Sequence, residues 1–289
     1  MPRRAVAFWF MVAASPALAA GGPPAPDLAY GAYQRGDYVA ARGEAEKRLA
    51  VNPKDAAALT LIGRLHLDGA GAPRDPAEAM KWFRRAADAG GKDAAYLFGA
   101  ASLSGRDTPR DRGRARVYLE KAAAADHPAA LNLLGEMALE NEGGAPDFIR
   151  AAAYFRRAAG LDDADAAYGL ALLYKTGRGV AQDPKTAAQW LRRAAEAGHS
   201  AAMVELAIME FNGAGVARDR KDALALLRRA AEAGNVVAEN RLARLFAEGL
   251  GVEKNLVEAA RWNNRARAAG LVDARLDALL QASAAPSGK

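Results

Sequence analysis

Apolar and small residues repeat along the chain with the spacing of amphipathic helices. After Ala166, apolar side chains return at Leu170 and Tyr174, so that all three lie on one face of a helix. The next segment contains Gly177 and Gly179, which adopt positive φ at little cost and can end a helix. The pattern therefore predicts a helix that ends just before Gly177 and is followed by a loop.

A second helix is predicted after this loop. Asp183 suits the N-cap and Pro184 suits the first helical turn. The helix is expected to end near Gly198 and to bury one face, which consists of Ala187, Trp190, Leu191 and Ala194. The two helices together form a hairpin that cannot bury its apolar face alone.

The hairpin pattern returns every 36 residues. The segment GRGVAQDPKTAAQWLRRAAEAG at 177–198 is nearly repeated as GAGVARDRKDALALLRRAAEAG at 213–234. The same register carries an alanine series, Ala58, Ala94, Ala130, Ala166, Ala202 and Ala238, and an aromatic series, Trp82, Tyr118, Tyr154, Trp190, Leu226 and Trp262. It also carries a cap series, Asp75, Asp111, Asp147, Asp183, Asp219 and Asn255. Six units run from residue 55 to residue 270, which predicts an all-α solenoid of stacked hairpins.

Segments of a different character flank the six units. Residues 28–54 are predicted to form an N-terminal capping hairpin, and residues 271–281 a C-terminal capping helix. Residues 282–289 are predicted to be a disordered tail. The solenoid is expected to be monomeric.

Residues 1–19 have the order of a secretory signal peptide. Arg3 and Arg4 precede an apolar stretch over residues 5–14, and Ala17 and Ala19 form the small-residue cleavage signal. A membrane-spanning helix needs about 20 apolar residues, so this stretch is too short to cross a bilayer comfortably; an uncleaved anchor is the alternative. Residues 20–27 are predicted to be a flexible lead-in. We expect a periplasmic or secreted protein with no stable membrane insertion after cleavage.

Charge and cysteine content narrow the classes of partner. The chain contains no cysteine, which excludes disulfides and thiolate metal sites, and its formal net charge is only +6. Arginine pairs recur on the second helices at Arg84-Arg85, Arg156-Arg157, Arg192-Arg193 and Arg228-Arg229. Cations near a helix C-terminus complement its dipole, and arginine stems cover apolar surface. We therefore expect a structural role for these pairs and no nucleic-acid partner.

The residues shared by the units carry a resemblance to the Sel1-like repeat family, a relative of the tetratricopeptide repeat. The matching residues of one unit are Ala166, Leu170, Ala171, Tyr174, Gly177, Gly179, Val180, Asp183, Ala187, Trp190, Ala194, Ala195 and Gly198. The unit that begins near Ala130 departs from the pattern, because Asn141 replaces the loop glycine. Residues 32–59 resemble a tetratricopeptide-type hairpin. The resemblance implies a right-handed superhelix with a concave groove that binds proteins or peptides.

Groove residues are expected at positions that vary between units, because the scaffold positions all solve one packing problem. On a helical wheel, the positions equivalent to 60, 64 and 67 lie opposite the repeated apolar face of the first helix. The predicted groove residues are Arg64, Tyr96, Asn132, Glu136, Tyr168, Leu172, Lys175, Val204, Ile208, Phe211, Asn240 and Arg244. The alternative for position 67 is packing against the adjacent unit, which we favour for Leu67, Leu103 and Leu139.

Candidate catalytic chemistry is sparse. We expect His66 to be a core or helix-interface residue, and we expect His127 and His199 to be surface loop residues too far apart to share a metal. No catalytic motif or acid–base pair stands out, so we predict no enzyme activity, cofactor or metal. Secreted relatives proposed to act on β-lactams are cysteine-rich, and this chain is not.

Three functional hypotheses follow from this sequence. The first is an exported scaffold that binds a protein or peptide partner, with regulation of envelope signalling as its sharper form. The second is a cell-wall or β-lactam hydrolase, and the third is a structural organiser of the envelope.

Overall fold

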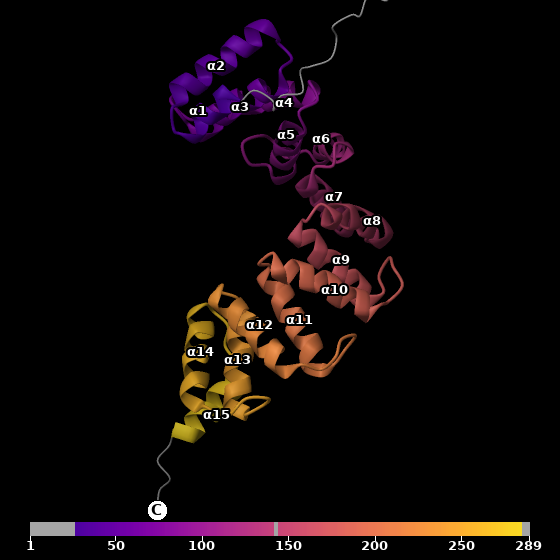
Figure 1. Ribbon diagram of the computed structural model, residues 1–289, viewed down its shortest axis with the longest axis vertical. Helices are drawn as coiled ribbons and strands as arrows, with labels where there is room; N and C mark the ends of the chain where they lie inside the picture. Colours follow the sequence, from indigo (N-terminus) through magenta and orange to yellow (C-terminus); the bar gives the residue numbers. More distant parts are fainter. Residues whose placement is uncertain (1–26, 142–143, 285–289) are drawn as a thin grey trace, which may run out of the picture.

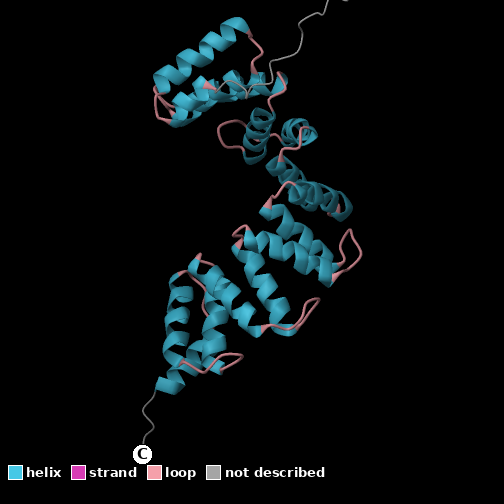
Figure 2. Cartoon of the chain, in the orientation of Figure 1, coloured by secondary structure: helices cyan, strands magenta, loops and turns pink. Residues whose placement is uncertain are grey.

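The computed structural model describes residues 27–141 and 144–284 (Figure 1). The predicted signal peptide, most of the lead-in and most of the tail lie outside these ranges. All regular elements in the described ranges are helices (Figure 2). They are α1 (Leu28–Gln34), α2 (Tyr38–Val51), α3 (Ala56–Asp68), α4 (Pro76–Asp88), α5 (Lys92–Ser104), α6 (Arg112–Ala124), α7 (Pro128–Glu140), α8 (Phe148–Gly160), α9 (Ala164–Thr176), α10 (Pro184–Glu196), α11 (Ser200–Asn212), α12 (Arg220–Glu232), α13 (Val236–Glu248), α14 (Leu256–Ala268) and α15 (Ala274–Ala284).

Consecutive helices pair into hairpins, and each hairpin packs on the next. The pairs α3/α4 to α13/α14 form the six repeated units, α1/α2 packs on the first of them, and α15 packs on α13 and α14. Figure 1 shows the hairpins following a curved path from α1 at the top to α15 at the bottom. The predicted all-α solenoid is therefore confirmed.

Short polar caps set the helix boundaries. The cap series of the sequence is confirmed, because each of its six members accepts a backbone amide at the start of a second helix. Five of the six repeated first helices end at a residue in the left-handed region, which is glycine, as at Gly177 with φ of 72°. Asn141 takes that place in the third unit, with φ of 28°. Glycine adopts this conformation without steric cost.

The core lies between the two helices of each hairpin and between neighbouring hairpins. Phe155 of α8 is 3% exposed and meets two glycines of different units. A β-carbon on Gly135 of α7 would lie 2.5 Å from Cε1 of Phe155, and one on Gly169 of α9 would lie 3.1 Å from Cε2. The small residues of the first helices therefore make room for large residues of the second helices.

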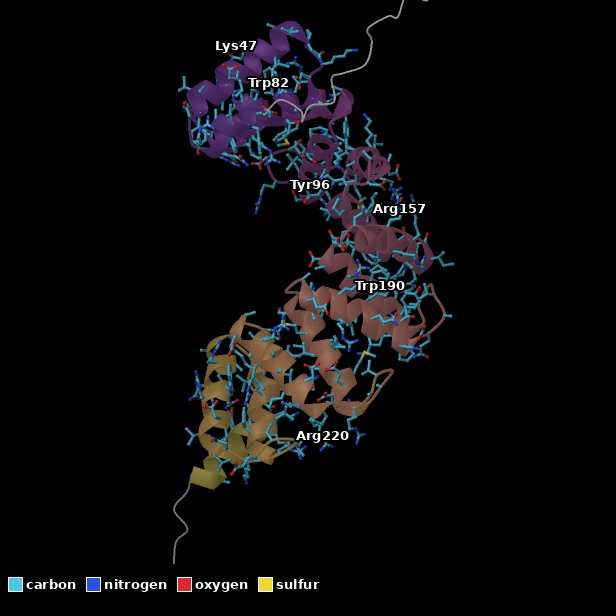
Figure 3. All side chains as sticks on the ribbon, viewed as in Figure 1. Lys47, Trp82, Tyr96, Arg157, Trp190 and Arg220 are labelled. Atoms are coloured by element: carbon cyan, nitrogen blue, oxygen red, sulfur yellow. The ribbon has the colours of Figure 1, made fainter. Side chains whose placement is uncertain are left out.

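The aromatic series lies one position away from the deepest part of the core. Trp190 is half-buried and carries the guanidinium of Arg193 at 4.8 Å from its ring, whereas its neighbour Leu191 is fully buried (Figure 3). Trp190 thus lies on the predicted face and packs against the core, but it is less buried than its neighbours Leu191 and Ala194. The position after it supplies the buried large residue in each unit, namely Phe83, Leu119, Phe155, Leu191, Leu227 and Asn263.

The arginine pairs connect each hairpin to both of its neighbours. The first arginine of a pair reaches the next unit, as Arg192 does to Glu210 at 3.0 Å and Arg156 to the Tyr174 hydroxyl at 3.1 Å. The second arginine reaches back, as Arg157 of α8 does to the carbonyl of Ala123 near the C-terminal end of α6 at 2.8 Å. These contacts place positive charge at helix C-termini, where the dipole favours it. The pairs thus have the structural role expected from the sequence.

Candidate functional site

The first helices of the units form one wall of the solenoid. Neighbouring first helices contact each other directly in the pairs α3/α5, α5/α7 and α7/α9. In Figure 1, α5 and α7 lie on the left of the stack, and α6 and α8 lie on its right. The surface formed by the first helices carries all of the predicted groove residues. We call this surface the groove wall.

Two similar aromatic clusters stand on the groove wall. Tyr96 of α5 stacks on His127, the N-cap of α7, with ring centroids 4.5 Å apart. Tyr168 of α9 stacks in the same way on His199, the N-cap of α11, also at 4.5 Å. Each imidazole Nδ1 accepts a backbone amide of the helix that it caps. The two tyrosines are therefore half-buried and also join consecutive units.

A carboxylate faces each of these histidines on the other side. His127 Nε2 lies 3.6 Å from Asp93, and His199 Nε2 lies 3.4 Å from Asp165. Burial lowers the pKa of His127, and the Asp93 carboxylate opposes that shift. The expectation that His127 and His199 are surface loop residues is wrong, because both are largely buried caps. Their spacing of 31 residues after a tyrosine could have indicated these contacts from the sequence.

Asn132 and Glu136 occupy the unit between the two aromatic clusters. The Asn132 side chain is 8% exposed, and its Nδ2 donates to Glu136 Oε1 at 2.9 Å. Glu136 is exposed toward the groove. Partial burial of its carboxylate raises the pKa of Glu136, the Asn132 hydrogen bond opposes this, and the charges of Asp165, Glu140 and Asp163 raise it further.

An apolar pocket of about 230 Å³ lies between α11 and α13. Three of the predicted groove residues line it, namely Ile208, Phe211 and Arg244. Leu245 and Leu250 extend its apolar surface, and the guanidinium of Arg220 covers the Phe211 ring at 5.1 Å. A hydrophobic hollow next to arginine fits the side chain of a bound polypeptide.

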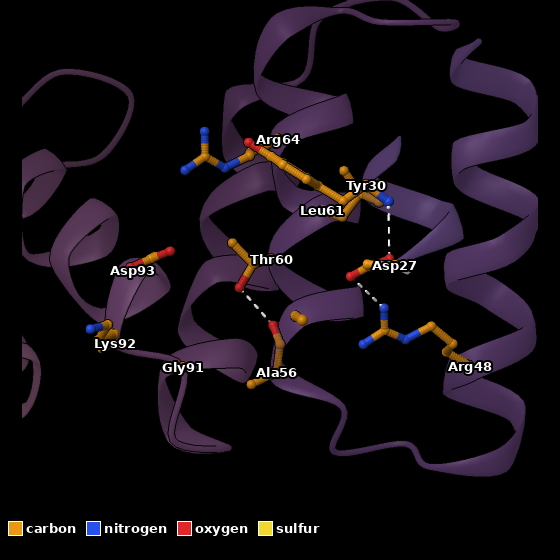
Figure 4. A pocket seen from close by; sticks show the side chains of 11 residues that line it. Asp27, Tyr30, Arg48, Ala56, Thr60, Leu61, Arg64, Gly91, Lys92 and Asp93 are labelled. Atoms are coloured by element: carbon orange, nitrogen blue, oxygen red, sulfur yellow. Dashed lines mark hydrogen bonds and ion pairs between the residues drawn. The ribbon is translucent and has the colours of Figure 1, made fainter. Parts of the chain in front are cut away.

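A second pocket of about 430 Å³ lies at the N-terminal end of the wall (Figure 4). Arg64, Thr60 and Lys92 line it, together with the Asp27–Arg48 ion pair at 2.7 Å. The Thr60 hydroxyl donates to the carbonyl of Ala56 within the same helix.

Other predicted groove residues have partners within the solenoid. Val204 is only 4% exposed, and Lys175 pairs with Glu205 at 2.6 Å. Asn240 and Arg244 both reach Asp273, which precedes α15. Leu172 is half-buried but is not packed into the core. Leu67, Leu103 and Leu139 are packed against the core, as the alternative for position 67 proposed.

Comparison with known proteins matches the repeat itself. The sequence model of the Sel1 repeat matches residues 56–91, 92–127, 128–163, 164–199, 200–235 and 236–271. The chain belongs to the Sel1 repeat family. Each match begins at or next to the start of a first helix and ends just before the next one. Comparison with curated proteins gave no match.

Two solved structures resemble this Sel1 repeat protein closely. A Sel1 repeat protein from Oxalobacter formigenes is 32% identical with a TM-score of 0.74, over 83% of this chain and 98% of that chain. The protective antigen c5321 of uropathogenic Escherichia coli, which displays an SLR fold, is 27% identical with a TM-score of 0.77. That match covers 86% of this chain but only 53% of c5321, so this chain spans about half the length of that relative.

Chemistry beyond binding finds little support in the described residues of this Sel1 protein. Over residues 27–141 and 144–284, no three His, Asp or Glu side chains gather as metal ligands, and no helix is both long and apolar enough to cross a bilayer. Glu210 faces Asp222, and its burial raises its pKa while Arg192 opposes the shift. The Glu210 residue is only 3% exposed, whereas Asp222 is exposed.

Proposed function

We propose that this Sel1 repeat protein is an exported scaffold that binds a protein or peptide partner along the groove wall. The observation that carries the proposal is the pocket between α11 and α13, where Ile208 and Phe211 stand at positions that differ from unit to unit and Leu245 adds apolar surface. Residues that every unit needs for packing are repeated and buried, as the alanine series is. Variable, half-buried apolar residues on the same helices are therefore suited to a ligand.

Export places this binding in the cell envelope or outside the cell. The charged, apolar and small-residue order of residues 1–19 supports this part of the proposal. The finer proposal is that the scaffold regulates envelope signalling by binding the external domain of a membrane sensor. Fractionation should recover a chain that begins after Ala19 in the soluble envelope fraction.

Photo-cross-linking in cells tests the groove directly. We expect p-benzoylphenylalanine in place of Leu172 or Ile208 to cross-link one and the same partner polypeptide. The control position is Ile149 on α8, which is 73% exposed but lies on a second helix. Mass spectrometry of the cross-linked peptides identifies the partner and its bound segment.

The three positions separate the proposal from a structural role without a defined ligand. Cross-links from 172 and 208 but not from 149 support groove binding. A partner captured equally from position 149, or no partner from either groove position, contradicts it.

A further inference from the structure

The middle of the groove wall carries carboxylates that the protein leaves unneutralised. Glu136 forms no ion pair with the other described residues, and within them its side-chain hydrogen bond comes from the neutral amide of Asn132. Asp93 and Asp165 lie on the neighbouring first helices, α5 and α9, and each faces an imidazole. We call these three residues the acidic section.

Cations close to the acidic section are few or already engaged. Lys175 pairs with Glu205, and Arg112 pairs with Glu140 at 2.7 Å. Burial lowers the pKa of His127, so its imidazole is neutral at neutral pH and leaves the Asp93 charge in place. Lys92, in the first turn of α5, acts on His127, and it lines one pocket together with Asp93 and Arg64, so cations are present at the Asp93 end of the section. The basic residues Arg241 and Arg244 lie farther along the wall, on α13.

Apolar side chains accompany the acidic section. Leu97 of α5 and Leu133 of α7, which follow Tyr96 and Asn132 in the sequence, are half-buried and pack against the core. Lysine and arginine side chains match this surface, because each has a long aliphatic stem that ends in a positive charge. The wall therefore offers contact to the stem and carboxylates to the charged end.

We propose that the acidic section, Asp93, Glu136 and Asp165, binds lysine or arginine side chains of the partner polypeptide, with no single side chain in contact with both Asp93 and Asp165. This inference rests on the proposed function of the groove. Charge complementarity selects the occupant: an acidic segment would be repelled, and an apolar segment would strip water from carboxylates that it could not pair.

Selection from a library of displayed random peptides tests the inference without knowledge of the natural partner. We expect peptides selected on the full wild-type chain to be enriched in lysine and arginine. On Glu136→Lys the selected peptides should instead be enriched in aspartate and glutamate. The matched control is Glu196→Lys on α10, an exposed glutamate of a second helix, which should select the wild-type set.

Affinity measurements on one selected peptide then separate this inference from the proposed function. Glu136→Gln should weaken binding about tenfold, the size expected for a lost hydrogen bond to a charged group. Peptides that lose affinity for Ile208→Asp but show no basic enrichment and no response to Glu136→Gln overturn the acidic section and leave groove binding intact. A selection that yields no peptide sensitive to either substitution contradicts both proposals.

The pH dependence of this affinity gives a second readout. Binding of a basic peptide needs an ionised Glu136, so affinity should fall as the pH drops through the raised pKa of that carboxyl. In Glu136→Gln, the part of the pH dependence that comes from ionisation of Glu136 should be absent. The other charged or titratable groups near this part of the wall are His127, His199, Asp93, Asp163, Asp165 and Glu140, and they are the same in both proteins, so the comparison isolates Glu136. Identical pH profiles for the two proteins would contradict a role for Glu136.

Discussion

Phe155→Ala is expected to lower the free energy of unfolding by about 3–5 kcal/mol, as large-to-small changes of buried aromatic residues do. The ring fills the space left by Gly135 of α7 and Gly169 of α9, so its loss opens a cavity between two units. Glycine cannot supply a side chain to fill that cavity. In a solenoid the interface between neighbouring units is a main source of stability, so the array should weaken at this junction.

Tyr154→Ala is the control for this prediction, because Tyr154 precedes Phe155 in the same helix and is only half-buried. Its ring packs under the guanidinium of Arg150 at 5.6 Å. We expect Tyr154→Ala to cost less than half as much as Phe155→Ala in urea unfolding. Hydrogen exchange of Phe155→Ala should show that the backbone amides of α7, α8 and α9 lose protection before those of the other helices. An equal or larger effect of Tyr154→Ala would mean that the aromatic series is the true core.

Gly179→Ala is expected to destabilise the protein by about 3–5 kcal/mol, from backbone strain and overpacking together. Gly179 has φ of 69°, and a β-carbon there would overlap the carbonyl group of Phe148 at the start of α8 in the preceding unit. The loop between α9 and α10 therefore rests directly on the neighbouring hairpin. Alanine would force the two backbones apart, and flexible side chains cannot absorb the overlap.

Gly234→Ala is the control that separates the steric clash with Phe148 from the backbone strain of alanine at positive φ. Gly234 also has a positive φ, of 82°, but a β-carbon there meets nothing within 4 Å. Its substitution should cost only about 1–2 kcal/mol, the strain of a left-handed alanine. Chemical denaturation of both variants, compared with the wild type, gives the difference. Equal decreases in the free energy of unfolding for the two variants would show that the contact with Phe148 adds nothing to the cost of Gly179→Ala.

The groove wall combines binding positions with contacts between units. Tyr96 and Tyr168 stack on the caps of the following first helices, so replacing them would alter both stability and binding. Leu172 and Ile208 do not stack on the cap of a neighbouring helix, so replacing them should affect partner binding more than stability. They are therefore better probes of partner binding. Glu136 is likewise suited to testing the charge of the partner, because it forms no ion pair with the other described residues that its substitution would break.

The sequence alone predicted the repeated architecture well. The alanine series, the cap series and the loop glycines recur every 36 residues, and each has a local physical cause in helix spacing, capping or positive φ. Such causes act within one hairpin, so they can be read from a short segment. The sequence also indicated that the arginine pairs interact with helix C-termini. It did not indicate that arginines on the second helices bind carbonyl groups of the preceding unit, as Arg157 and Arg265 do.

The candidate groove was predicted less completely. Its residues were chosen by a helical wheel, which gives the face of one helix but not the distance to the next unit. The wheel therefore placed Val204 with exposed residues, whereas the packing of neighbouring helices leaves it 4% exposed. The apolar pocket between α11 and α13 and the pairing of Tyr96 with His127 also depend on two units at once.

Periodicity and capping by themselves determined the helical hairpins, their number and their stacking as a solenoid, since these follow from short-range preferences repeated along the chain. Tertiary structure alone decided which position of each second helix is deepest in the core, and which charges of the groove wall are left unpaired. Both depend on how far the next hairpin is turned and shifted, and that relation arises from the packing of large residues against glycine and alanine across the interface.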